Sequence, residues 1–352
     1  MVKKSPENTT PAIVDNVEAL EAKLAQMREA QALFATYTQE QVDKIFYEAA
    51  MAANKARIPL AKMAIEETGR GVLEDKVIKN HYAAEYIYNA YKNTKTCGVL
   101  ERDEAYGITK IAEPIGIVGA VIPTTNPTST AIFKTLICLK TRNAIILSPH
   151  PHAVNCSIAA AKIIRDAAIE AGLPEHVISW VSVPSLEISD YLMKNVDLIM
   201  ATGGSGMVKA AYSSGTPAIG VGPGNCNVVI DESADLRMAV ESIIHSKTFD
   251  NGMICASEQH ITVLASVYDE VKRLLKEARC YFLKDDEAAK VAEVFFNSKT
   301  HGVKPGAVGQ TANRLAEMAG IDVPYDTKVL IYETDDTSHD CPWANEKLTT
   351  LL

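Results

Sequence analysis

Residues 115–149 read IGIVGAVIPTTNPTSTAIFKTLICLKTRNAIILSP and hold two short apolar runs, IGIVGAVI and NAIILS, on either side of a longer stretch with helical spacing. Runs of this length predict strands, and the stretch between them predicts a helix. Both runs are apolar throughout instead of alternating with polar residues. They are therefore expected to be parallel strands of right-handed βαβ units, in a sheet that helices cover on both faces.

The same alternation of short apolar runs and helical stretches continues to residue 231. Further apolar runs are VISWVSVP, VDLIMATGG, PAIGVG and NVVID, and VNCSIAAAKIIRDAAIEAG is a further helical stretch. Residues 17–92 are rich in Ala, Glu, Lys and Leu at helical spacing and predict several helices. The predicted fold class is α/β, a doubly wound Rossmann-type parallel sheet at about 110–245 that follows this helical region.

A chain of 352 residues exceeds the roughly 250–300 residues at which single hydrophobic cores stop growing, so two domains are expected. A second α/β segment begins at about residue 258, and the boundary falls near Cys255, where clefts usually form. The predicted domains are 1–245 and 246–352.

Composition and charge exclude several classes of function. The net charge of −9 is spread along the chain, which argues against a nucleic-acid partner. The N-terminal MVKKSPENTTPAIVDN has no apolar segment, and the apolar run 131–147 is interrupted by Lys134, Lys140 and Arg142, so neither a signal peptide nor a membrane span is predicted. Seven widely spaced cysteines without a C-x-x-C pair indicate reduced thiols in a cytoplasmic protein and no metal site.

Cys255 lies in KTFDNGMICASEQH, residues 247–260, between a turn signal and an apolar run. A free cysteine is most often a small buried hydrophobe. The preceding Asp-Asn-Gly could instead present Cys255 at a surface, where a thiol with a lowered pKa is a nucleophile. The local sequence leaves both interpretations open.

Asn126 lies in IPTTNPTST, where a predicted strand ends and a helix opens. Followed by Pro127, it fits a helix N-cap, and that structural role is sufficient by itself. The alternative is that its side-chain amide donates to a developing oxyanion. Nothing local decides between them.

The stretch ATGGSGMVKAAYSSG, residues 201–215, predicts a strand end, a glycine-rich turn and a helix. Such a turn suits a phosphate, but G-G-x-G is not the full dinucleotide fingerprint, so a tight turn is an equal alternative. His150 and His152, between prolines, indicate only a surface loop. Glu346 taken alone reads as a solvated glutamate.

Taken in order along the chain, these motifs resemble the aldehyde dehydrogenase family. The resemblance is strongest to its CoA-acylating branch, in the aldehyde dehydrogenase part of bifunctional aldehyde-alcohol dehydrogenases. It rests on EDKVIKNHYAAEYIYNAYKNTKTCGVL, PTTNPTSTAIFK, SPHP, ATGGSGMVKAAYSSG and FDNGMICASEQ, and it extends from about residue 17 to Leu348.

The resemblance implies roles for individual residues. Cys255 matches the nucleophile, and Asn126 matches the amide that forms the oxyanion hole with the Cys255 N–H. Glu346 matches the glutamate that binds the nicotinamide ribose. The other positions that the resemblance assigns to cofactor binding are Thr124, Pro149, His150, Gly203, Gly204, Ser205 and Gly222.

Three positions depart from the wider family. Gly220-Val-Gly-Pro223 stands where hydrolytic members have Glu-Leu-Gly-Gly, so the base that activates water is missing. Ser148 replaces a lysine at the adenosine ribose, and Val208 replaces the last glycine of the G-x-x-x-x-G loop.

The implied activity is a reversible, acylating acetaldehyde dehydrogenase that uses NAD and takes CoA as co-substrate, through a thioester on Cys255. One alternative is a hydrolytic aldehyde dehydrogenase in which another carboxylate, such as Glu258, activates water. A second alternative is a non-catalytic fragment. The implied partners are a small aldehyde, acyl-CoA and further copies of the chain in a homo-oligomer, with no membrane and no nucleic acid.

NEKL at 345–348 matches the family, whereas the following TTLL does not continue as its usual Ser-Pro sequence. The resemblance therefore implies an NAD-binding domain at 1–245 and a catalytic domain at 246–352 that is incomplete at Leu352. Exposed apolar surface and unpaired sheet edges are then expected to cause weak turnover and aggregation.

Overall fold

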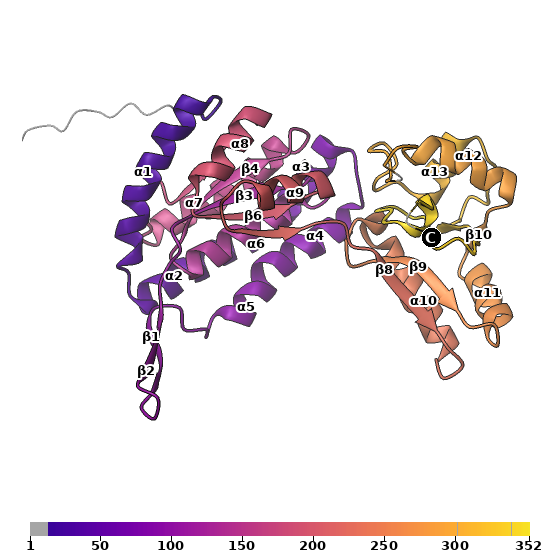
Figure 1. Ribbon diagram of the computed structural model, residues 1–352, viewed down its shortest axis with the longest axis horizontal. Coiled ribbons are helices and arrows are strands. Elements are labelled where there is room, and N and C mark those ends of the chain that lie inside the picture. Colours follow the sequence, from indigo (N-terminus) through magenta and orange to yellow (C-terminus); the bar gives the residue numbers. More distant parts are fainter. Residues whose placement is uncertain (1–12, 301, 339) are drawn as a thin grey trace, which may run out of the picture. The chain divides into compact units, whose positions relative to one another are not determined.

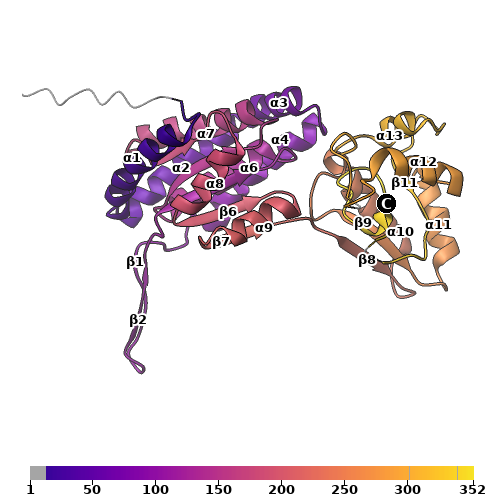
Figure 2. The same cartoon turned by 45° about the horizontal axis from the view of Figure 1, so that its top comes forward.

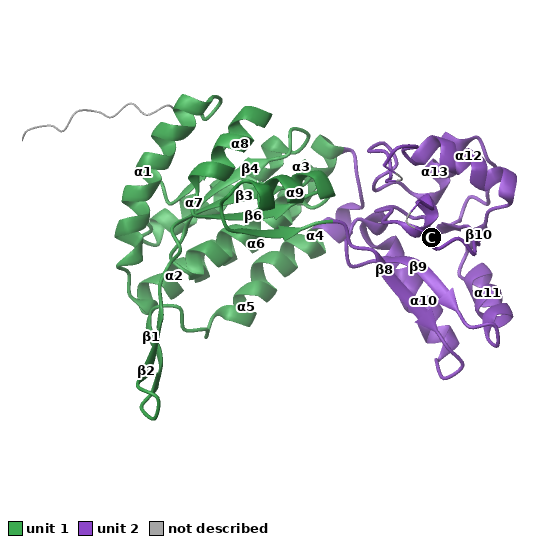
Figure 3. Cartoon of the chain, in the orientation of Figure 1, with its two compact units in different colours: residues 1–68, 77–222 green, residues 69–76, 223–352 purple. Residues whose placement is uncertain are grey.

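The computed structural model describes residues 13–300, 302–338 and 340–352. The prediction for the N-terminal segment lies mostly outside these residues. By their contacts the residues form two compact units, one of residues 1–68 and 77–222 and the other of 69–76 and 223–352 (Figure 3). The contact boundary at 222–223 precedes the expected functional boundary at 245–246, and the functional assignment of the two domains stays a prediction.

Unit 1 opens with helices, as predicted for residues 17–92. They are α1 (Val17–Ala35), α2 (Gln39–Lys55), α3 (Arg57–Thr68) and α4 (Leu73–His81), continued by a π-helical turn (Tyr82–Tyr86) and α5 (Ile87–Tyr91). The first residues of α4 belong to unit 2 by their contacts. An antiparallel hairpin of β1 (Gly98–Asp103) and β2 (Ile108–Ala112), which the sequence analysis missed, follows.

The core of unit 1 is a five-stranded sheet in the order β5-β4-β3-β6-β7, with every neighbouring pair parallel. Its strands are β3 (Ile117–Ile122), β4 (Ala144–Pro149), β5 (Ile178–Trp180), β6 (Leu198–Thr202) and β7 (Ala218–Val221). The helices between them are α6 (Pro127–Lys140), α7 (Val154–Glu170), α8 (Leu186–Asn195) and α9 (Ser205–Ser213). Every residue of β4 is buried, which explains its continuous apolar sequence.

Helices cover both faces of this sheet, as Figures 1 and 2 show. Helices α6 and α7 pack on β3, β4 and β5, and α2 packs on both helices. Helices α1 and α8 contact each other, and α1 also reaches β3 and β4. Helix α9 contacts β6 and β7. The chain moves from β3 toward β5 through α6 and α7, and in the opposite direction from β6 to β7 through α9. Because such crossovers are right-handed, α9 lies on the face opposite α6 and α7. The predicted doubly wound α/β fold is confirmed.

Unit 2 is also α/β, with two small parallel sheets, β8-β9 and β10-β11. Its strands are β8 (Cys226–Ile230), β9 (Glu258–Val263), β10 (Cys280–Phe282) and β11 (Val329–Ile331). Its helices are α10 (Leu236–Thr248), a 3-10 turn (Phe249–Gly252), α11 (Tyr268–Glu277), α12 (Asp285–Phe295), α13 (Ala312–Ala319) and a second 3-10 turn (Pro342–Ala344). Asp235 is the N-cap of α10, and its carboxylate accepts from the Met238 N–H.

The N-terminus of α7 is capped from another helix. Its own N-cap residue, Ala153, has no side chain that can cap. The carboxylate of Glu67, at the end of α3, accepts from the backbone N–H groups of Asn155 at 2.8 Å and Cys156 at 2.7 Å. Burial alone raises the pKa of Glu67, but these hydrogen bonds outweigh it and hold the pKa below its ordinary value.

We expect Glu67→Gln to weaken unit 1 by about 1 kcal/mol at neutral pH, the usual cost of losing a helix cap. Because the pKa of Glu67 is depressed in the folded chain, its contribution is present above the unfolded pKa of about 4.3 and is lost as the pH falls through the folded value. Urea unfolding followed by circular dichroism at pH 7 and at acidic pH measures the difference. Glu66→Gln, at an exposed position of the same helix, is the control; an equal effect of both substitutions would contradict the cap.

Candidate functional site

In unit 1 the predicted cofactor residues follow three adjacent strands. Thr124 and Asn126 come after β3, Pro149 ends β4 with His150 directly after it, and Gly203 follows β6. All three strands are parallel, so these residues share the carboxyl edge of the sheet. The strand order reverses between β3 and β6, and such a switch point is where open α/β sheets bind ligands.

The turn into α9 has the features of an anion site. Its N-cap is Gly204, which offers no side chain to the first turn of the helix. A β-carbon at Gly204 or Gly206 would meet no atom within 4 Å, so the backbone there is openly accessible. Free N–H groups at a helix N-terminus attract phosphate.

Helix α9 also closes the space beside Gly220. A β-carbon on Gly220 would lie 2.8 Å from Val208 Cγ1 and 2.8 Å from the Tyr212 ring. The Gly220 N–H donates to the Tyr212 hydroxyl at 3.0 Å. Val208 and Gly220, two of the positions that depart from the wider family, therefore pack against each other. The Val208 side chain occupies the space that any side chain at position 220 would need.

Asn126 occupies the N-cap position of α6, with Pro127 as the first helical residue, but its side chain does not cap the helix. Its Oδ1 accepts from Lys79 Nζ at 2.7 Å, and its Nδ2 donates to Thr125 Oγ1 at 3.1 Å. The predicted N-cap position with proline as the first helical residue is confirmed, but the Asn126 side chain makes no capping hydrogen bond. Lys79 was missed, because nothing in the sequence marks an exposed-looking lysine on α4 as a partner of Asn126.

Lys134 was noted only as an interruption of an apolar run. The structure buries it, 4% exposed, beneath the switch point. Its Nζ donates to Val121 O and Met200 O, both at 2.8 Å, and so joins β3 to β6. Burial lowers the pKa of Lys134 to about 7.

In unit 2, Cys255 lies in the connection between the 3-10 turn and β9, and its side chain is exposed. The turn before it has three consecutive residues with positive φ: Asp250 at 48°, Asn251 at 53° and Gly252 at 74°. Such a backbone is costly for residues other than glycine unless the surroundings hold it. The interpretation of Cys255 as a core residue does not fit this exposure.

Asp250 holds that turn. It is fully buried and pairs with Lys76 Nζ at 3.1 Å, and Lys76 is itself 3% exposed. Its Oδ1 accepts from the Val72 N–H at 2.8 Å, while its own N–H donates to Asp75 Oδ2 at 2.7 Å. A β-carbon on Gly71 would lie 2.0 Å from Asp250 Oδ1, so only glycine lets the two segments approach. We call this contact of residues 71–76 with Asp250 the loop clamp.

Gly224 connects Cys255 to Glu346. A β-carbon on Gly224 would lie 2.0 Å from Cys255 O, and the Gly224 N–H donates to Glu346 Oε1 at 2.8 Å. Glu346 is half-buried. The interpretation of Glu346 as a solvated glutamate, made from its local sequence alone, is therefore wrong. Burial raises its pKa, against the opposing effects of the Gly224 N–H and of Lys247.

Two buried lysines lie behind this segment, around Gln259. Lys247 Nζ donates to Glu258 O at 2.9 Å, and Lys347 Nζ donates to Gln259 O at 2.7 Å. Burial lowers the pKa of both, that of Lys347 to about 7. Glu258, the base of the hydrolytic alternative, has an Oε2 that is buried without a hydrogen-bond partner among the described residues.

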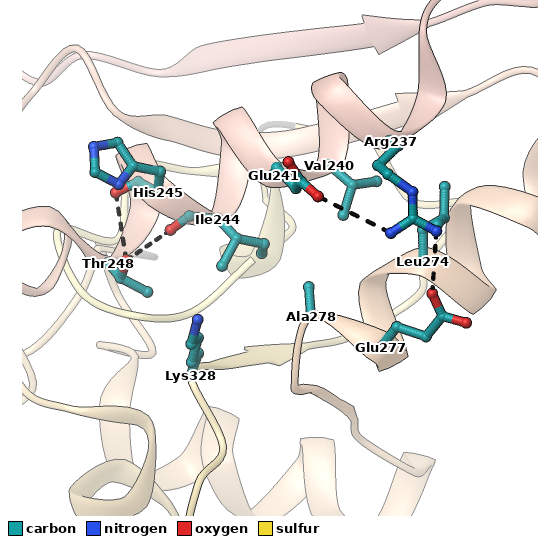
Figure 4. A pocket seen from close by; sticks show the side chains of 10 residues that line it. All are labelled: Arg237, Val240, Glu241, Ile244, His245, Thr248, Leu274, Glu277, Ala278 and Lys328. Carbon is teal, nitrogen blue, oxygen red and sulfur yellow. Dashed lines mark hydrogen bonds and ion pairs between the residues drawn. The ribbon is translucent and has the colours of Figure 1, made fainter.

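A cavity of about 460 Å³ lies in unit 2 beside α10 and α11 (Figure 4). Figure 4 shows Arg237 directed at Glu241 and Glu277, with which it pairs at 4.0 and 3.6 Å. These charges satisfy one another, and no predicted site residue lines the cavity. In the described part of the chain, no group of three or more His, Cys, Asp or Glu side chains could hold a metal, and no helix is long and apolar enough to span a membrane.

Comparison with known proteins identifies the family of the chain. The model of the aldehyde dehydrogenase family matches residues 9–291. The chain belongs to the aldehyde dehydrogenase family. It is 58% identical over 339 residues to the aldehyde-alcohol dehydrogenase of Clostridium acetobutylicum, covering 96% of this chain and 39% of that relative.

Solved aldehyde dehydrogenases give the same result. An acetylating aldehyde dehydrogenase from Geobacillus thermoglucosidasius superposes with a TM-score of 0.92 at 46% identity, covering 95% of this chain and 74% of that one. The propionaldehyde dehydrogenase of Rhodopseudomonas palustris, solved with bound CoA and an acylated cysteine, superposes with a TM-score of 0.82 at 28% identity, covering 96% and 76%. The chain spans about two fifths of the length of its curated aldehyde-alcohol dehydrogenase relative.

Within this aldehyde dehydrogenase, each unit gathers part of the predicted site. Unit 1 brings Thr124, Asn126, Pro149, His150 and the turn at 203–205 to one sheet edge, with Gly222 just after β7. Unit 2 joins Cys255 and Glu346 through Gly224. The catalytic and binding roles of these residues stay predictions.

We expect Lys76→Met to destabilise the aldehyde dehydrogenase by about 3–5 kcal/mol, because it leaves the Asp250 carboxylate buried without its cation. Asp250→Asn removes that charge and keeps an acceptor for the Val72 N–H, so the double variant should be more stable than Lys76→Met alone. Urea unfolding and the rate of Cys255 alkylation by iodoacetamide measure both effects. Lys62→Met, at an exposed position of α3, is the control; a single variant as stable as the control would contradict the loop clamp.

Proposed function

We propose that this chain catalyses the reversible, CoA-dependent oxidation of acetaldehyde to acetyl-CoA, with NAD as the hydride acceptor. The observation that carries the proposal is the exposed thiol of Cys255 on a loop fixed by buried contacts, in a chain with glycine at 220. The similarity to an acetylating aldehyde dehydrogenase and to aldehyde-alcohol dehydrogenases supports the same reaction.

The residues of this chain fit the cofactor that the proposal requires. The uncapped first turn of α9, with Gly203, Gly204 and Ser205, suits the pyrophosphate. Glu346 would bind the nicotinamide ribose, because a carboxylate that accepts from the Gly224 N–H keeps further acceptor positions. Thr124, Pro149, His150 and Gly222 complete the proposed contacts. When bound, NAD supplies the hydride acceptor.

In the proposed mechanism the Cys255 thiolate attacks the aldehyde carbon. The Asn126 amide and the Cys255 N–H hold the resulting oxyanion, a role carried over from the family resemblance and worth about 10² to 10³ in rate per donor. The cation of Lys79 at Asn126 Oδ1 polarises the amide and makes its N–H groups stronger donors. Loss of the hydride leaves an acyl thioester on Cys255.

The acyl group then passes to the sulfur of CoA, and the Cys255 thiolate is released. One thioester replaces another, so the free-energy change is small and the step runs in both directions. Hydrolysis requires a base for water. Gly220 supplies none, and Val208 and Tyr212 occupy the adjoining space. This is why we favour acyl transfer over hydrolysis.

We also propose that the enzyme acts in the cytoplasm and as a homo-oligomer. The first proposal rests on seven cysteines that form no disulfide in the described part of the chain, as a reducing compartment maintains them. The second rests on the family resemblance alone.

An assay of NADH formation from acetaldehyde, with and without CoA, tests the proposed reaction. We expect CoA-dependent turnover, acetyl-CoA as the product, and loss of activity in Cys255→Ala because the thioester cannot form. Cys97→Ala, a cysteine of unit 1 outside the proposed site, should retain activity. Rapid acetate formation that is indifferent to CoA would favour hydrolysis, and undiminished activity of Cys255→Ala would refute the nucleophile.

We expect Gly220→Glu not to create a hydrolase, because the added β-carbon meets Val208 and Tyr212 at 2.8 Å. The substitution should lower stability by about 1–3 kcal/mol, as overpacking usually does, and leave the ratio of acetate to acetyl-CoA unchanged. Gly220→Glu combined with Val208→Gly should recover part of the stability. Ile219→Glu adds the same carboxylate at an exposed neighbour, 56% exposed, and is the control; efficient acetate formation by Gly220→Glu alone would contradict the packing argument.

A further inference from the structure

The cysteines of this chain fall into two groups by burial. Five are buried: Cys97, Cys138, Cys156, Cys280 and Cys341. Only Cys255, which is exposed, and Cys226, which is partly exposed, are accessible to solvent. The two accessible thiols belong to one site in unit 2.

Cys226 contacts the peptide of Cys255 directly. Cys226 is the first residue of β8 and pairs in register with Glu258 of β9, three residues after Cys255. Its thiol donates to Cys255 O at 3.5 Å. Gly224, two residues earlier, is so close that a β-carbon there would lie 3.1 Å from Cys255 Cβ. The start of β8 therefore runs along the backbone that carries the nucleophile.

A cysteine side chain has one torsion between its backbone and its sulfur, and the staggered positions of that torsion are readily exchanged. Such a rotation moves the Cys226 thiol away from the Cys255 carbonyl, to which it donates at 3.5 Å. A disulfide requires β-carbons about 3.5–4.5 Å apart. Segment 224–226 lies close to Cys255 at both of its ends, at Gly224 and at the Cys226 sulfur.

We propose that Cys226 is a modification site, a resolving thiol that forms a reversible disulfide with Cys255 when a peroxide oxidises the nucleophile. In the first step the Cys255 thiolate attacks one oxygen of hydrogen peroxide, the O–O bond breaks, and the products are a sulfenic acid on Cys255 and a hydroxide ion, which takes a proton from solvent. In the second step the Cys226 sulfur attacks the Cys255 sulfur, and the sulfenic oxygen leaves as water. The peroxide is the oxidant, and a dithiol returns both cysteines to thiols.

The disulfide protects Cys255 from further oxidation. Sulfenic acid that meets no second thiol proceeds to sulfinic and sulfonic acids, which thiol reductants do not reverse. The buried thiols are poor competitors for this role. Burial raises the pKa of Cys138 and of Cys280 to about 12, so these groups stay protonated and unreactive.

This inference rests on the proposed function only in taking Cys255 as the nucleophile that oxidation disables. Bond formation can be observed without turnover. Trypsin cleaves after Lys209, Arg237, Lys247 and Lys272, so Cys226 and Cys255 fall in the separate peptides 210–237 and 248–272. A linkage between these two peptides therefore identifies the disulfide.

The test treats the full chain with hydrogen peroxide, blocks the remaining thiols, digests without reductant and identifies the peptides by mass spectrometry. We expect the linked pair 210–237 and 248–272, and recovery of most of the lost turnover on addition of dithiothreitol. In Cys226→Ser the linked pair should be absent, Cys255 should carry two or three oxygens, and dithiothreitol should restore little activity. Cys97→Ser, which alters a buried thiol of unit 1, should behave as the unsubstituted chain.

Several outcomes would overturn the proposal. One is unlinked wild-type peptides with Cys255 oxidised to sulfinic acid, and another is a linkage of Cys255 to a different cysteine. Full recovery of Cys226→Ser by dithiothreitol would also overturn it. A mixture of ¹⁵N-labelled and unlabelled chains distinguishes linkage within one chain from linkage between chains, and pairs of mixed label would count against it. A chain that forms the disulfide but shows no turnover supports this inference and refutes the proposed function instead.

Discussion

The buried ion pair of Lys76 and Asp250 is the contact on which the site in unit 2 depends. It holds a turn whose residues have positive φ, and that turn leads directly to Cys255. A charge pair this deeply buried is stabilising only while both partners and their hydrogen bonds remain. The Val72 N–H, which donates to the Asp250 carboxylate, and the Asp75 carboxylate, which accepts from the Asp250 N–H, complete this set. A short segment far away in the sequence therefore controls the loop of the proposed nucleophile.

Close backbone approach is the second constraint. Gly71 lies against Asp250, and Gly224 lies against Cys255. At both positions a β-carbon would come within 2.0 Å of an oxygen atom, so the absence of a side chain is a packing requirement. Gly220 obeys the same rule in unit 1, where Val208 and Tyr212 fill the adjoining space. Gly71 and Gly224 thus allow the packing that positions the Cys255 loop. Gly220 is part of the packing that underlies the proposed preference for acyl transfer over hydrolysis.

Buried lysines recur behind the proposed site residues. Lys134 joins two strands beneath the sheet edge, and Lys247 and Lys347 surround Gln259 in unit 2. Each donates to oxygen atoms of the chain around it. Burial lowers the pKa values of all three lysines, because desolvation disfavours the charged ammonium group. Buried hydrogen-bond networks of this kind make the surrounding backbone rigid, which suits the fixed positions that the proposed site residues require.

The sequence alone determined the α/β class, the helical N-terminal region and the strands of the parallel sheet, because buried parallel strands and amphipathic helices have distinct apolar periods. It also identified Cys255, Asn126 and Glu346 as candidates, through turn chemistry and family resemblance. It did not predict the β1–β2 hairpin, whose strands are mostly exposed and lack a continuous apolar run.

Only the tertiary structure decided what holds these candidates. Lys79 meets Asn126, Lys76 meets Asp250, and Cys226 meets Cys255, across separations of 47, 174 and 29 residues. Each of these partners is ordinary in its local sequence, so no period or motif marks it. Contacts between distant segments arise from packing of the whole chain, which local patterns do not encode.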